Sequence, residues 1–159
     1  MNMNKFVSWI DYEFKSYYLD SSKRDLRIIK DKNINLKKAN FICEYLKFLR
    51  KRYFFPLRCY IHLTAGSKYK SANNKYCYGI FFPGDEKKKT FPSIYLPIGS
   101  EDTFYNNLDD IFQLTKLLTY YYQWYFLQDT KRSNRSLEIE ATKMASFLVD
   151  EYKVYLNNI

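Results

Sequence analysis

One stretch of the chain constrains the fold more than any other, because it is apolar on nearly every side. It runs from about Asn106 to Leu127, and six of the seven residues from Tyr120 to Phe126 are aromatic. A helix without a polar face has to be covered by other elements all around. We therefore expect a central, buried helix here, with the rest of the core built against it.

The size and composition fit one folded domain, residues 1–159. A chain of 159 residues can bury one sizeable core. Hydrophobic residues make up 47% and charged residues 27%, close to the average of folded proteins, which excludes global disorder. No run of about eighteen apolar residues occurs, so no membrane span is expected.

Three parts with different periodicities follow one another along this domain. A helical, basic N-terminal part covers 1–56, a sheet covers 57–99, and a pair of helices covers 100–159. This order predicts an α+β fold with a small three-stranded sheet, mixed or antiparallel, N-terminal helices and two long C-terminal helices.

The predicted helices have apolar residues three or four positions apart. They cover 4–19, 37–53, 106–127 and 133–156, with a loop over 20–36 and Ser100 as the N-cap of the third helix.

The predicted strands cover 57–64, 76–82 and 93–98. The first alternates apolar and polar residues. The last is flanked by Pro92 and Pro97, which favours an edge position because proline lacks the N–H that a central strand needs.

A sequence motif lies on the two C-terminal helices. Residues 114–124 read L-T-K-L-L-T-Y-Y-Y-Q-W, and residues 136–142 read S-L-E-I-E-A-T. Together they resemble a small zincin metallopeptidase domain of the gluzincin type, whose pattern is L-x-H-E-x-x-H-Y-x-Q-W followed by E-x-E-A-[DN]. The general plan of that family, three strands before the metal-binding helix, resembles the layout over about 57–156.

The resemblance implies a metal site whose ligands have been replaced. Two histidines four residues apart share a zinc ion in such domains, and a glutamate activates the metal-bound water. Here Lys116 and Tyr120 stand at the histidine positions, Leu117 stands at the glutamate position, Glu138 matches the carboxylate ligand, and Thr142 replaces the acidic or amide partner. A lysine ammonium has no lone pair for a metal, and leucine cannot transfer a proton. We therefore expect a pseudoenzyme with no catalytic residues, no metal and no cofactor.

The replacements suggest a new link between the two helices. A buried Glu138 without zinc would be energetically unfavourable, and Lys116 could supply the missing positive charge. The hypothesis is a Lys116–Glu138 contact in place of the metal. The alternative is that both are unrelated surface residues.

Histidine and cysteine offer no other catalytic set. His62 is the single histidine and lies on the polar side of a predicted strand, which favours a half-exposed strand residue over a catalytic base. Cys43, Cys59 and Cys77 lack zinc-binding spacing and are expected to be reduced thiols, as in a cytoplasmic protein.

The net charge of +9 is unevenly distributed. Residues 1–99 hold 20 Lys and Arg against 8 Asp and Glu, whereas residues 100–159 hold 6 against 9. The basic part predicts an anionic partner, either a nucleic acid or an acidic protein. The basic and aromatic binding candidates are Lys47, Arg50, Lys51, Arg52, Lys87, Lys88, Lys89, Tyr121 and Trp124.

Three functional hypotheses follow, of which the third is an enzyme with unrecognised chemistry around Lys116. The first is a degenerate metallopeptidase-like domain that binds a macromolecule, with a protein partner favoured, nucleic acid open, and a homodimer through exposed aromatic residues also open. Inhibition of a host protein by a domain carried on a mobile element is a use that the resemblance implies. The alternative is a basic accessory protein that binds nucleic acid without a base-reading motif.

Overall fold

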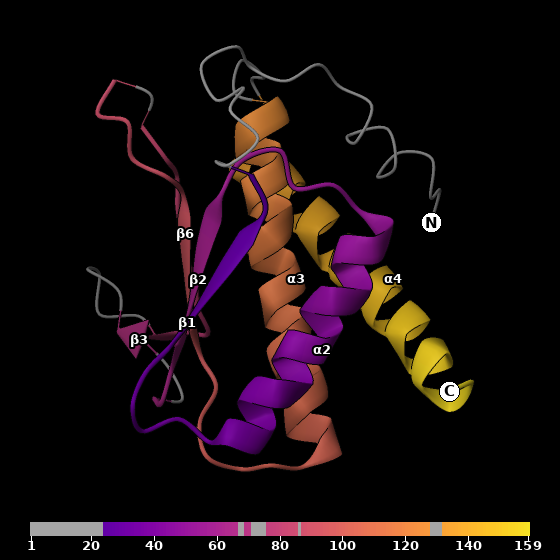
Figure 1. Ribbon diagram of the computed structural model, residues 1–159. Helices are drawn as coiled ribbons and strands as arrows, with labels where there is room; N and C mark the ends of the chain where they lie inside the picture. Colours follow the sequence, from indigo (N-terminus) through magenta and orange to yellow (C-terminus); the bar gives the residue numbers. More distant parts are fainter. Residues whose placement is uncertain (1–23, 67–68, 71–75, 86, 128–131) are drawn as a thin grey trace.

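The computed structural model describes residues 24–66, 69–70, 76–85, 87–127 and 132–159 (Figure 1). The helix expected over 4–19 lies outside these residues. The described part is α+β, with a four-stranded sheet, a separate two-stranded sheet and three helices. All three helices lie on one side of the larger sheet, and α3 runs between that sheet and α4 (Figure 1).

The elements follow one another in the order β1 (Leu26–Lys30), α2 (Leu36–Arg52), β2 (Cys59–Thr64), β3 (Tyr69–Lys70), β4 (Tyr76–Cys77), β5 (Ile80–Phe82), β6 (Ser93–Pro97), α3 (Phe104–Phe126) and α4 (Asn134–Asn157).

The larger sheet has four strands rather than the expected three, in the order β1-β2-β6-β5. The strands β1, β2 and β6 are parallel, and β5 runs antiparallel to β6, so the sheet is mixed. The additional strand, β1, lies inside the loop expected over 20–36. Its five residues, L-R-I-I-K, do not alternate regularly between apolar and polar, so the sequence gives little period-two signal. The segment becomes a strand by pairing with β2.

The prediction that 93–98 is an edge strand is wrong, because β6 pairs with β2 on one side and with β5 on the other. The prolines permit this because they lie at the strand's two ends. Pro92 precedes the strand, and its carbonyl accepts a hydrogen bond from the Tyr60 N–H at 3.1 Å. Pro97 is the last residue of the strand. The interior residues therefore keep the N–H groups that a central strand requires.

Alternation along the strands separates a buried face from a half-exposed one. Cys59, Ile61 and Leu63 of β2 are fully buried, and Ile94 and Leu96 of β6 lie beside them. This face contacts the helices and forms one core with them.

The helices match their predicted ranges closely, and each begins at a capping side chain. Asn35 caps α2 and Ser133 caps α4. Thr103, not the expected Ser100, caps α3 by accepting a hydrogen bond from the Asn106 N–H. The expectation of a central α3 is confirmed, since Tyr121 and Tyr125 are fully buried in the core. None of the helices in the described ranges has the combined length and apolar character that crossing a membrane requires.

The hydroxyl of Tyr121 fixes α3 to the chain just before β2. It donates to the Leu57 carbonyl at 2.6 Å and accepts from the Leu57 N–H at 3.0 Å. Burial raises the pKa of this phenol well above its ordinary value, so the group stays neutral. We expect Tyr121→Phe to lower the free energy of unfolding by about 1–3 kcal/mol, because it leaves two buried backbone groups unpaired.

Urea denaturation measures this difference, with Tyr105→Phe as the matched control. Tyr105 is 82% exposed, so its substitution should change stability by less than about 0.5 kcal/mol. Equal stabilities of the two variants would contradict the assigned role of Tyr121.

Candidate functional site

The motif positions on α3 and α4 lie in different environments. Lys116 and Tyr120 are half-buried, Leu117 is buried, and Glu138 and Thr142 are exposed. Burial raises the pKa of Tyr120, and the negative charge of Glu138 raises it further. The Tyr120 hydroxyl and the Glu138 carboxylate therefore lie within electrostatic range of each other.

The expected Lys116–Glu138 contact does not form, since none of the ion pairs among the described residues joins these two side chains. The physical reason is that the Glu138 carboxylate is exposed to water and needs no buried counter-charge. The Thr142 hydroxyl donates to the Glu138 carbonyl at 3.0 Å, a bond within α4 rather than between helices.

A different polar link joins the two helices, two residues further along α4. Glu140 is 5% exposed, and its Oε1 accepts hydrogen bonds from Gln123 Nε2 at 3.0 Å and from an Arg132 guanidinium nitrogen at 3.1 Å. Gln123 Nε2 also donates to the Leu137 carbonyl at 2.9 Å. This link was not predicted from the sequence. The sequence does hold one indication of the link, because Gln123 is the one polar residue within the aromatic run. A buried amide side chain needs hydrogen-bond partners.

The residues at the motif positions do not fit a zinc ion. Only Glu138 among them offers a ligand of the kind that zinc ordinarily takes in proteins, because Lys116 is an ammonium, Tyr120 a neutral phenol and Leu117 a hydrocarbon. Within the part of the chain that the structure describes, no three His, Cys, Asp or Glu residues are grouped so as to hold a metal.

The two aromatic binding candidates lie mainly inside the molecule. Tyr121 is fully buried, so it is not available as a surface anchor. Trp124 is half-buried and contacts Phe81 of β5, with 6.2 Å between the ring centroids.

The basic candidates of α2 lie on the helical side of the molecule. Lys47 and Lys51 are exposed. Arg50 is held by an ion pair with Asp25 at 3.1 Å. The Arg52 guanidinium stacks on a core ring of the same helix, 4.1 Å from its centroid.

The basic candidates Lys87, Lys88 and Lys89 lie in the turn between β5 and β6 and are exposed. Asp85 shapes this turn, since its carboxylate accepts the Lys87 and Lys88 backbone N–H groups at 2.9 and 3.3 Å. No ion pair engages the three ammonium groups within the described residues. The basic candidates therefore form two separate clusters.

The sheet face opposite the helices, which we call the open face, carries aromatic residues. Paired residues of neighbouring strands share a face, so the register defines two rows across the sheet. The rows are Arg27, Tyr60, Ser93 and Phe82, then Ile29, His62, Tyr95 and Ile80. No described helix covers this face (Figure 1).

Ring contacts organise the open face. His62 and Tyr95 stack with parallel rings at 4.2 Å, and Phe82 meets Tyr95 edge-on at 5.6 Å. Phe82 is 47% exposed and Ile29 is 40% exposed. The imidazole of His62 is thus a stacking partner on a half-exposed strand.

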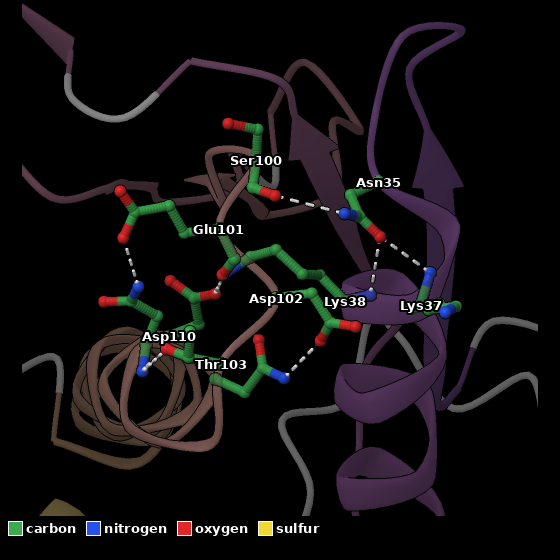
Figure 2. A network of polar contacts seen from close by, with 10 residues as sticks. Asn35, Lys37, Lys38, Ser100, Glu101, Asp102, Thr103 and Asp110 are labelled. Carbon is green, nitrogen blue, oxygen red and sulfur yellow. Dashed lines mark hydrogen bonds and ion pairs between the residues drawn. The ribbon is translucent and has the colours of Figure 1, made fainter.

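A buried lysine connects α2, α3 and the segment that joins β6 to α3 (Figure 2). Lys38 is 1% exposed, and its Nζ lies 2.8 Å from Asp110 Oδ2 and 2.8 Å from the Glu101 carbonyl. Asn35 adds a second connection, because its side chain caps α2 and also donates to the Ser100 carbonyl at 3.1 Å.

A crevice of about 720 Å³ lies beside this connection, where β2 and β6 end and α3 begins. It is lined by Lys38, Ala65, Tyr78, Leu96, Pro97, Ile98, Gly99, Ser100, Glu101, Asn106, Asp109, Asp110 and Gln113. Its one lysine is paired and its three carboxyl groups make it acidic, so it does not suit an anionic partner.

Comparisons with protein-family models, curated proteins and solved structures found no match to this chain.

The first prediction here concerns Glu138 and Glu140, which are two residues apart on α4. We expect Glu140→Ala to lower the free energy of unfolding by about 1–3 kcal/mol, because Gln123 and Arg132 lose a buried acceptor. Glu138→Ala should change it by less than about 0.5 kcal/mol, because that carboxylate is exposed. Urea denaturation compares the two variants. A larger loss for Glu138→Ala would reinstate the predicted Lys116–Glu138 link.

The second prediction concerns Asp110. Burial raises the pKa of its carboxyl to about 6 from 3.8, and the opposing effect of Lys38 only partly offsets burial. The folded state therefore binds this proton more tightly than the unfolded state, so the stability contributed by protonation is lost as the pH rises from about 4 to above 6.

Asp110→Asn removes this titration. As the pH rises over that range, the free energy of unfolding of the wild type should fall by about 1–2 kcal/mol relative to that of Asp110→Asn. This magnitude allows for solvent screening. Urea denaturation of both proteins at the two ends of the range measures the shift. A difference that stays constant with pH would refute the assignment.

Proposed function

We propose that this chain is a non-catalytic, metallopeptidase-like domain that acts by binding a macromolecular partner. The observation that carries the proposal is the set of side chains at the motif positions. Lys116, Leu117 and Tyr120 cannot bind zinc or activate water as the family's residues do, although the two helices pack together and Tyr120 lies near Glu138.

The arrangement of the helix pair supports this reading beyond the motif itself. The buried interhelical link is Glu140 with Gln123 and Arg132, and it holds α3 against α4 with no need for a metal. A scaffold stabilised in this way can keep its shape after the ligands of a metal site have been replaced. The function then has to reside on its surfaces, and inhibition of a host protein by a domain carried on a mobile element is one use of such a scaffold.

The test restores two metal ligands on α3. In the variant Lys116→His/Tyr120→His, two imidazoles four residues apart would lie on one face of α3. With Glu138 they would offer a ligand set of two histidines and one carboxylate. We expect this variant to bind one zinc ion. At a free zinc concentration of about 100 times Kd, the free energy of unfolding should rise by about 2.7 kcal/mol. The wild type should show no zinc-dependent stabilisation.

The control adds Glu138→Ala to the two histidines, which should weaken zinc binding. Calorimetric titration with zinc and thermal denaturation measure all three proteins. If the two-histidine variant folds but binds no zinc, the helix pair lacks the peptidase-like geometry. If the wild type binds stoichiometric zinc or cleaves an unfolded protein substrate, the proposal of a non-catalytic domain fails.

A further inference from the structure

We propose that the open face of the sheet binds single-stranded nucleic acid. The inference rests on the proposed function, because it names the partner that a non-catalytic domain of this kind would take. Three observations carry it, namely the aromatic rows, the cations that border them, and the position of both on a sheet face that no described helix covers.

The first observation is the aromatic content of a half-exposed surface. Tyr60, Tyr95 and Phe82 lie within two neighbouring rows, with Phe82 on the edge strand β5 and nearly half exposed. Bases of a single strand stack on such rings with little dependence on sequence, because every base has a π face. Hydroxyl and imidazole groups beside the rings can bond to exposed base edges.

The second observation is the charge at one end of these rows. Arg27 lies in the first row, and Arg58 precedes β2 with its guanidinium over the ring of Phe91, 5.6 Å from its centroid. Phe91 in turn contacts Tyr60 at 6.2 Å, which places Arg58 on the open face. The exposed residues Lys87–Lys89 lie in the turn before β6, at the same end of the sheet.

The acidic residues near this end do not cancel the positive charge. Asp25 is paired with Arg50, and Asp85 accepts two backbone N–H groups of its own turn. Glu86 belongs to the same turn in the sequence and lies outside the described residues. The four cations Arg27, Lys87, Lys88 and Lys89 still outnumber the two carboxylates of Asp85 and Glu86. Phosphates would therefore be attracted here while the bases reach the aromatic rows.

The arrangement favours a single strand over a duplex. A duplex hides the faces of its bases, whereas the open face offers rings for stacking and, among the described elements, carries no helix that could enter a major groove. It also favours nucleic acid over an acidic polypeptide, which would use the cations but would leave the aromatic rows without a stacking partner.

The experiment measures fluorescence anisotropy of labelled single-stranded oligothymidylate and oligouridylate of twenty residues, with a duplex of the same length alongside. We expect binding of the single strands that weakens roughly 20- to 130-fold between 50 and 200 mM salt, as for three to five neutralised phosphates. The duplex should bind at least about tenfold more weakly, because it cannot stack on the rings.

Matched variants distinguish binding at the open face from non-specific binding to the positive charge of the whole protein. Lys87→Ser/Lys88→Ser and Lys47→Ser/Lys51→Ser remove the same charge from the two separate clusters, and only the first should reduce affinity, by about tenfold or more. Phe82→Leu should reduce affinity by about tenfold, and Phe82→Tyr should retain it because the ring remains. Tyr105→Leu, at an exposed tyrosine on α3, should have no effect. Thermal denaturation checks that each variant folds.

Three outcomes would overturn the inference. The first is no binding of either single strand up to about 10⁻⁴ M, the weak end of non-specific affinities. The second is equal weakening by the two lysine pairs, and the third is displacement by polyglutamate as effective as by unlabelled oligonucleotide. None of these outcomes contradicts the proposed non-catalytic function. That proposal is contradicted only if the wild type binds zinc or cleaves protein.

Discussion

The buried ion pair between Lys38 and Asp110 is the constraint on which the rest of the architecture depends. It joins the first turn of α2 to α3, and the additional bond from Lys38 to the Glu101 carbonyl fixes the segment that leads out of β6. A charged group so deeply buried is tolerated only where partners surround it, and removing one partner leaves the other charge uncompensated. The two helices therefore have a defined position against the end of the sheet.

The positions of the helices could be predicted from the sequence, but part of the sheet could not. The period of 3.6 residues in the apolar positions predicted the extents of α2, α3 and α4 to within a few residues. The reason is that each helix buries at least one continuous stripe of apolar side chains. Strand β1 carries no such local signal and depends on pairing with β2. The prolines beside β6 suggested an edge, since sequence shows that N–H groups are missing but not that they are missing only at the strand ends.

Most of the candidate site could likewise not be predicted from the sequence. The motif predicted a Lys116–Glu138 link, which does not form because sequence does not tell which side chains remain hydrated. The link actually made, through Gln123 and Glu140, joins two segments whose contact only the tertiary structure provides. The open face was equally hidden, because its rows combine residues from four strands that are scattered between positions 27 and 95.

The order of the elements along the chain has a consequence for synthesis. Strand β2 emerges from the ribosome well before α3, yet its buried residues Cys59, Ile61 and Leu63 are covered by helices that include this later one. A nascent chain that ends near residue 100 would expose one apolar side of a nearly complete sheet. Such surfaces are prone to association before folding is finished. The packing of α3 against this side is therefore the late step that removes it from solvent.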